Sequence, residues 1–139
     1  MSDKGIEMLK RSEGVELRPY KDTTGKWTVG VGHLMLPNDE MKDYSEVEVN
    51  TMLKSDLKLA EDTINRLVLV PLTQTEFDAL VHFTFNVGIR AFKLSTLLRK
   101  LNNKQYIGAA NEFMAWTKQK ELIGRRKKER NLFLNEVYS

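Results

Sequence analysis

Two carboxylates and a hydroxyl lie within a short stretch near the start of the chain. Eight residues separate Glu13 from Asp22, and five more separate Asp22 from Thr28. Hydrolysis of a glycosidic bond uses a carboxylic acid that protonates the leaving oxygen and a second polar group that holds the attacking water. These residue types therefore predict a glycoside hydrolase site, provided that the fold brings them together.

The surroundings of the two acids predict different protonation states. A helix over residues 2–13 would place Glu13 at the end of an apolar stripe that includes Ile6 and Leu9. Apolar surroundings hinder the ionisation of a carboxyl group, which suits a general acid. Asp22 begins a predicted turn over residues 22–25, where backbone N–H groups favour the ionised form.

A strand is predicted after this turn. Over residues 27–32, bulky apolar side chains alternate with Thr28 and two glycines, and such alternation is typical of a strand. Thr28 would lie on the nearly bare face, as the floor of a groove. Each feature alone has an ordinary structural explanation in helix-end solvation, turn chemistry or strand propensity. Their joint spacing favours the functional interpretation.

The segment resembles the phage-type lysozymes, whose pattern has a Glu, eight residues, an Asp, five residues and a Thr. Further matching positions are Gly14, Tyr20, Gly25, Gly30, Gly32 and His33. Residues 70–92 and 123–133 are also similar to family segments, so the resemblance covers nearly the whole chain. The chain departs from the pattern at residues 118–121 and 93–94, where relatives often carry glycine.

The resemblance implies a muramidase that cuts the β-1,4 bond between N-acetylmuramic acid and N-acetylglucosamine of peptidoglycan. It implies that Glu13 is the general acid, that Asp22 and Thr28 position the water, and that the configuration is inverted. By position, Leu34 and Phe85 resemble groove-wall residues that contact substrate. Core packing remains the alternative for each of these two.

The fold class expected is α+β: a mostly helical, lysozyme-like fold in a single domain over residues 1–139. A β-containing lobe over about 13–45 and a helical lobe over about 70–139 would be joined by a long helix, with the N-terminal helix packed on the helical lobe. Capping-box patterns predict helix starts at Ser45 and Thr73. Ser95 can cap a short helix, and further helices are expected over about 105–116 and from about 123.

Composition argues against metal and redox chemistry. The chain has no cysteine, and its two histidines, His33 and His82, are far apart in sequence, so neither a metal site nor a cofactor is expected. We interpret His33 as a structural hydrogen-bonding residue and His82 as a surface or half-buried one. Trp27 and Trp116 are expected in the core.

The charge distribution leaves two other functions open. The net charge is +3, and seven of the basic residues fall between Lys118 and Arg130. This run is most simply a solvated helix face, although nucleic acid would also suit it. No nucleic-acid-binding signature accompanies the run, so no nucleic-acid partner is expected. A non-catalytic module with a lysozyme fold that binds peptidoglycan or a partner is the main alternative.

The expected location follows from the lack of a membrane signal. No stretch has the length and apolarity of a transmembrane helix, and residues 1–10 lack the apolar region of a signal peptide. We therefore expect a monomer without membrane insertion that stays in the host bacterial cytoplasm until it is released to the cell wall. The resemblance implies that a holin provides this access, and peptidoglycan is the expected partner.

Overall fold

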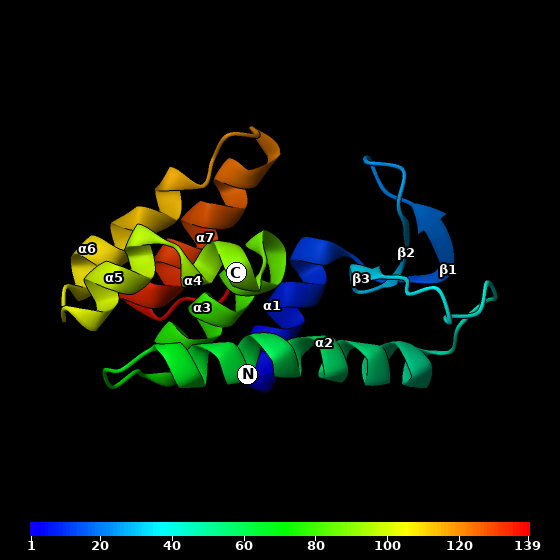
Figure 1. Cartoon of the computed structure of the whole chain (residues 1–139), viewed down its shortest axis with the longest axis horizontal. Helices are drawn as coiled ribbons and strands as arrows, with labels where there is room; N and C mark the ends of the chain where they lie inside the picture. The colour runs from blue at the N-terminus through cyan, green and yellow to red at the C-terminus, as the bar shows by residue number, and fades with distance from the viewer.

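The computed structural model describes residues 1–139 and consists mainly of helices with one small antiparallel sheet (Figure 1). The elements are α1 (Asp3–Glu13), β1 (Glu16–Lys21), β2 (Trp27–Gly30), β3 (His33–Leu34), α2 (Glu46–Leu67), α3 (Gln74–Val87), α4 (Ile89–Lys93), α5 (Thr96–Asn102), α6 (Tyr106–Asn111), the 3₁₀ helix η1 (Glu112–Ala115) and α7 (Glu121–Asn135). This arrangement confirms the α+β fold class. No helix combines the length and apolarity needed to cross a membrane.

Helix α1 ends directly after Glu13. Ser2 begins the helix, because its hydroxyl accepts a hydrogen bond from the Gly5 N–H at 3.1 Å. Gly14 ends it with a φ of +78° and donates its N–H to the Lys10 carbonyl at 2.8 Å. A left-handed glycine at this place lets the chain leave the helix axis. Glu13 is thereby the last helical residue before the chain turns into the sheet.

The sheet has the order β1-β2-β3, with Thr28 in the central strand. Thr28 pairs with Tyr20 of β1 on one side and with Leu34 of β3 on the other. The strand is shorter than predicted, because it ends at Gly30. Gly30 and Gly32 have φ values of +68° and +63°, which turn the chain back into β3.

Strand β1 is the weakly held edge of this sheet. Its pairing with β2 is irregular between Glu16 and Tyr20, and its first three residues are exposed. Pro19 within the strand has no N–H to donate, which is typical of an edge strand. Trp27 at the start of β2 is 43% exposed, with the Lys21 ammonium 5.4 Å from its ring centre. The prediction that Trp27 lies in the core is therefore wrong.

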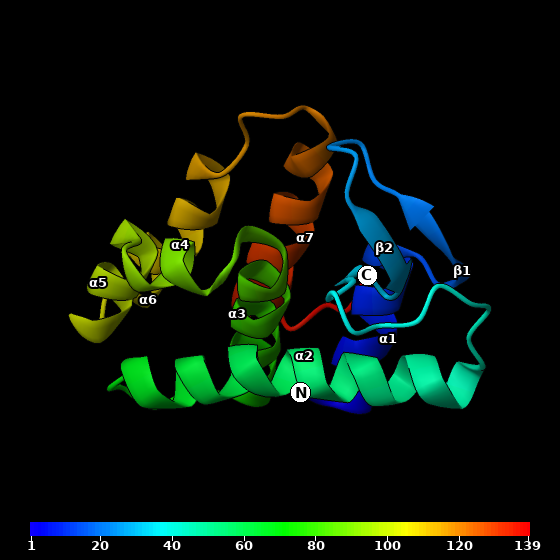
Figure 2. The same cartoon turned by 45° about the vertical axis from the view of Figure 1, so that its right-hand side comes forward.

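Helix α2 connects the sheet with the remaining helices. It begins at the predicted capping box, in which Ser45 and Glu48 bond each other's backbone N–H groups. Its 22 residues span about 33 Å at the usual rise per residue. It runs beneath both the sheet and the helices (Figures 1 and 2) and contacts β2 and β3 as well as α3 and α4.

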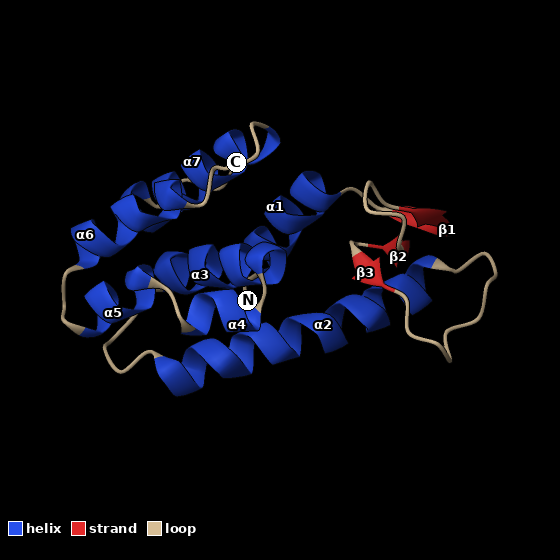
Figure 3. Ribbon diagram, turned by 45° about the horizontal axis from the view of Figure 1, so that its top comes forward, coloured by secondary structure: helices blue, strands red, loops and turns tan.

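Helix α3 is central to the helical part, with α1 and α7 packed against it (Figure 3). Phe83 of α3 packs edge-on against Phe113 at 5.2 Å and against Trp116 at 5.7 Å between ring centres. The predicted capping box at Thr73 and the left-handed Gly88 bound this helix. Two expectations need correction: residues 105–116 form α6 and η1 rather than one helix, and α7 begins at Glu121.

Candidate active site

Glu13 is paired with a cation from the far end of the chain. Its Oε1 accepts hydrogen bonds from both terminal nitrogens of Arg125 at 3.3 Å, and Arg125 Nη2 also donates to the Ser12 carbonyl at 2.9 Å. Only 15% of the Glu13 side chain is exposed. The prediction of a purely apolar setting for this carboxylate is therefore wrong, although Leu9 on the same helix is buried.

Gly32 brings the chain against the other oxygen of Glu13. A Cβ atom on this residue would lie 3.1 Å from Glu13 Oε2, tighter than an unstrained contact. Gly32 also lines a cavity of about 700 Å³ between the sheet, α2 and the end of α3. The carboxylate of Glu13 therefore lies beside a residue that lines the cavity, although Glu13 is not itself part of the lining.

Leu34 of β3 and Phe85 of α3 both line the same cavity. Leu34 is 49% exposed, so it is available to a ligand rather than packed in the core. The structure thus brings together the two residues that sequence position suggested as groove walls. Their contact with sugar stays a prediction.

Asp22 is held in the charged form by its own turn. Its Oδ1 accepts hydrogen bonds from the Thr24 hydroxyl at 2.7 Å and from the N–H groups of Thr24 and Lys26 at 2.9 Å each. The Thr24 hydroxyl is the largest cause that lowers the pKa of Asp22, followed by the Lys26 backbone. Oδ2 has no partner in the protein and is free to accept from a water. The predicted ionised state of Asp22 agrees with this direction.

The phenol of Tyr20 is affected by the charges of both acids. Burial is the main cause that raises the pKa of its phenol, and the negative charges of Glu13, Glu16 and Asp22 raise it further. The charges of Glu13 and Asp22 therefore both act on this one hydroxyl. Thr28, directly across from Tyr20 in the sheet, is only 6% exposed.

The Thr28 hydroxyl faces its own chain. It donates to the Lys26 carbonyl at 3.2 Å, and no hydrogen bond joins it to Glu13 or Asp22. The structure thus shows a confined hydroxyl instead of the open groove floor that the strand pattern predicts. Thr28 can reach a water near Asp22 only by giving up or sharing this bond.

His33 joins the sheet to α2 beside the cavity. Its Nδ1 lies 2.8 Å from Asp56 Oδ2 and its Nε2 lies 3.0 Å from Asp39 Oδ2. Burial by itself would lower the pKa of His33, but the hydrogen bonds to Asp39 and Asp56 outweigh it and the pKa is raised. The interpretation of His33 as a structural hydrogen-bonding residue is confirmed.

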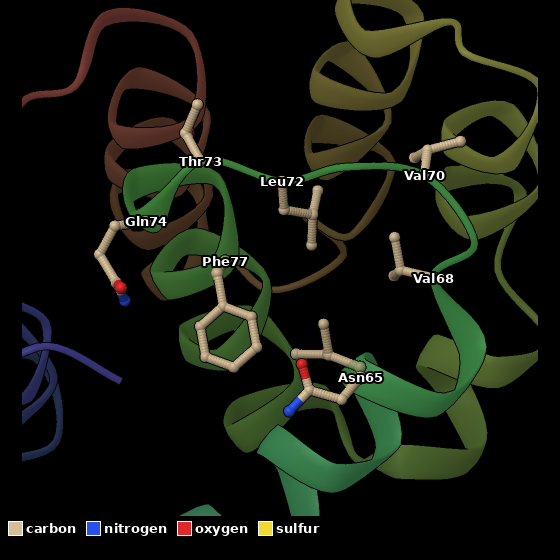
Figure 4. Close-up of a pocket in the computed structure, with 8 residues that line it drawn as sticks. Asn65, Val68, Val70, Leu72, Thr73, Gln74 and Phe77 are labelled. Carbon is tan, nitrogen blue, oxygen red and sulfur yellow. The ribbon is translucent and has the colours of Figure 1, made fainter.

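A second pocket lies where α2 passes to α3. Figure 4 shows Phe77 and Asn65 facing the space beneath the connecting loop that carries Leu72. Its lining includes neither carboxylate nor histidine. It therefore has no group for acid–base work and is not the candidate site.

The sequence analysis did not predict that several charged side chains of α7 lie in the interior of the protein. Arg125 contacts Glu13, and Arg126 is fully buried beside Glu129, so the basic run is not a uniformly solvated face. The spacing of Arg126, Glu129 and Phe133 at i, i+3 and i+7 was the available signal, because it places these residues on one side of a helix. His82 is 0% exposed, which also corrects its expected surface or half-buried position.

The phage lysozyme family model matches residues 10–129. The chain belongs to this family. The endolysin of Salmonella phage P22 is 41% identical over 97% of this chain and 98% of its own length. The solved endolysin from Escherichia coli O157:H7 phage FAHEc1 superposes with a TM-score of 0.92 at 31% identity, covering 99% of this chain and 95% of that one. The muramidase domain of SpmX from Asticcacaulis excentricus gives 0.88 at 35% identity, covering 96% and 97%.

Family membership makes the chain a glycoside hydrolase with a lysozyme-type activity on peptidoglycan. The alternative of a non-catalytic binding module with the same fold is not favoured.

Proposed function

We propose that the chain hydrolyses the β-1,4 bond between N-acetylmuramic acid and N-acetylglucosamine with Glu13 as the general acid. The observation that supports this assignment is the position of the Glu13 carboxylate against Gly32, which lines the cavity between the sheet and α3. A glycan bound along Leu34 and Phe85 would pass this carboxylate. Glu13 gives its proton to the leaving oxygen, and Arg125 at 3.3 Å stabilises the carboxylate that results.

Asp22 takes the second role in this proposal. An ionised carboxylate with one unpartnered oxygen can accept a hydrogen bond from a water and orient it towards the sugar ring. Thr28 helps to hold the same water from the neighbouring strand. Attack by this water on the face opposite the leaving group inverts the anomeric configuration.

Replacing Glu13 by Gln tests the assignment. The amide cannot give up a proton, so release of reducing sugar from purified peptidoglycan should fall by at least about 1,000-fold, near the loss expected when a general acid is removed. Glu7→Gln is the matched control, because Glu7 lies on the same helix and is 64% exposed. It should keep the parental rate. A Glu13→Gln protein that is folded and still active at the parental rate would disprove the role of Glu13.

Product stereochemistry tests inversion separately. Proton NMR of freshly released fragments should show the α-anomer first, because a single displacement at a β-linked carbon reverses its configuration. Initial appearance of the β-anomer would instead indicate a covalent intermediate on the enzyme and would remove Asp22 from its role as a water-binding group.

The family resemblance also supports a proposal for delivery. The chain acts as a monomer that is kept in the host cytoplasm and reaches the wall when a holin opens the membrane. Expression in cells with and without a separate membrane pore, followed by turbidity, should show lysis only with the pore. Light scattering of the purified chain should give the mass of one copy, 16.1 kDa.

A further inference from the structure

A fully buried group of charged and polar side chains lies behind Glu13. His82 of α3 and Arg126 and Glu129 of α7 are each 0% exposed. Arg126 Nε lies 2.6 Å from Glu129 Oε1, and Arg126 Nη2 donates to Asn86 Oδ1 at 2.8 Å. Burying charges is costly even when they are paired. The proposed chemistry does not use any of these groups directly, so their placement needs another explanation.

This buried group is connected to the residue that precedes Glu13. His82 Nδ1 lies 2.5 Å from Glu129 Oε2, and His82 Nε2 lies 3.0 Å from the Ser12 hydroxyl oxygen. Glu129, paired with Arg126, can only accept hydrogen bonds, so Nδ1 of His82 carries the hydrogen. Nε2 of His82 forms the other hydrogen bond of the ring, with the Ser12 hydroxyl.

Ser12 is thereby held from two helices at once. Its hydroxyl is bound by His82 on α3, and its carbonyl accepts from Arg125 on α7 at 2.9 Å. Carbonyl groups in the last turn of a helix lack partners within the helix, and helix ends fray. These two bonds fix the last turn of α1, and with it the backbone from which Glu13 projects.

We propose that His82, anchored by Glu129 and acting through the Ser12 hydroxyl, is a positioning residue for the carboxylate of Glu13. The inference rests on the proposed role of Glu13. His82 is 0% exposed and the Ser12 hydroxyl is bonded to it, so we assign both residues to positioning and not to substrate contact. Proton donation depends on placement within a fraction of an ångström, and loosening the end of α1 therefore slows the chemical step without weakening substrate binding.

The same three residue types, Ser, His and Glu, also make nucleophilic triads. The Ser12 hydroxyl is bonded to the fully buried His82. A scissile carbonyl would need access to that hydroxyl and donors for its oxyanion. The geometry favours positioning over nucleophilic attack.

Ser12→Ala is the direct test, because Ser12 is only partly buried and the change leaves His82, Glu129 and Arg126 in place. On soluble glycan strands, kcat should fall by about tenfold with KM unchanged, as expected for a misplaced catalytic group. Ser12→Thr keeps the hydroxyl and should restore most of kcat. Thr63→Val is the matched control, since it removes a helical hydroxyl that bonds only the Leu59 carbonyl, and kcat should not change.

A double-mutant cycle with His82→Gln tests whether the effect passes through one bond. If it does, Ser12→Ala combined with His82→Gln should lose no more kcat than the more severe single variant. Additive losses in kcat would overturn the proposal. Parental kcat for Ser12→Ala would overturn it as well, even if His82→Gln fails to fold.

The remaining outcomes are also decisive. If Ser12→Thr fails to restore kcat while the melting temperatures of the two Ser12 variants fall together, the role is structural only and the proposal is wrong. Labelling of the parental chain but not of Ser12→Ala by a fluorophosphonate would make Ser12 a nucleophile and would also overturn it. An inactive Glu13→Gln with a fully active Ser12→Ala would refute this inference alone, whereas a fully active Glu13→Gln would refute the proposed function.

Discussion

Glycine has two different uses within three residues of this chain. Gly30 and Gly32 both adopt positive φ, and a Cβ atom on either would make a contact of 3.0 to 3.1 Å. At Gly30 the neighbour is a methyl group of Val49, and at Gly32 it is the carboxylate of Glu13. Gly30 therefore lets the sheet pack on α2, whereas Gly32 sets how closely the chain approaches the proposed acid.

Alanine at these two positions should separate stability from activity. Gly32→Ala and Gly30→Ala should each cost about 2 kcal/mol of unfolding free energy from backbone strain and crowding. Only Gly32→Ala should also reduce kcat, because its methyl group pushes the carboxylate of Glu13 away from the cavity. Denaturant melts and initial rates on glycan strands measure the two effects. Equal losses of kcat in both variants would contradict the assigned difference.

The spacing of Glu13, Asp22 and Thr28 could be interpreted from sequence because the three residues lie within one short segment. Arg125 could not, since it reaches Glu13 across 112 residues and no local pattern encodes that contact. The apolar stripe of α1 therefore gave a wrong setting for Glu13. The confinement of Thr28 was missed for a similar reason, because pairing with both Tyr20 and Leu34 is a property of the assembled sheet.

The turn between β1 and β2 acts as a unit that controls the charge of Asp22. Its hydrogen bonds lower the pKa of this carboxyl group, the Thr24 hydroxyl being the largest cause. Thr23 in the same turn makes no such bond and is exposed. The two threonines therefore offer a matched pair for testing the turn.

Thr24→Val should move the acidic limb of the pH–rate profile to higher pH. Removing the hydroxyl removes a bond to the charged form, so the pKa of Asp22 rises and the carboxylate becomes protonated at a less acidic pH. The alkaline limb should stay in place. Initial rates across the acidic range measure the shift, with Thr23→Val as the control. Superimposed profiles for the parental chain and Thr24→Val would show that Asp22 does not set this limb.

Helix starts were predictable where the signal is local. The capping boxes at Ser45 and Thr73 each join residues three positions apart, which a sequence displays directly. The start of α7 has no such signal, because Lys120 at its N-cap makes no side-chain bond. The change from α6 to η1 near Glu112 likewise has no glycine or proline to mark it, so one continuous helix was predicted there.

At the scale of the molecule, the hydrogen bonds of His33 connect the sheet region to the long helix α2. One carboxylate partner, Asp39, follows the sheet, and the other, Asp56, lies on α2. Hydrogen bonds from the Leu36 backbone and then from His33 lower the pKa of Asp39, while the pKa of His33 is raised. The interaction of His33 with Asp39 and Asp56 is strongest at a pH where the histidine is protonated and both aspartates are ionised.

The stability of the molecule should therefore depend on pH through His33. Its raised pKa stabilises the folded state fully below the unfolded pKa of about 6.5, and this stabilisation is lost as the pH rises through the folded pKa. The lowered pKa of Asp39 acts in the opposite sense, stabilising above about 3.9 and losing this effect in acid. His33→Gln should flatten the alkaline fall in melting temperature measured from pH 5 to 9. Parallel curves for the two proteins would contradict this assignment.

The edge strand β1 has an energetic consequence for the whole molecule. With an interrupted ladder, four exposed residues and a proline in its middle, it contributes little burial of its own, and segments of that kind separate before the global transition. Local separation of β1 from β2 would move Tyr20 and the neighbouring Asp22 away from Glu13 while the helices stay folded. The proposed water-holding half of the site is thus built on a weakly held edge strand, and the proposed proton-donating half on a helix end that two other helices anchor.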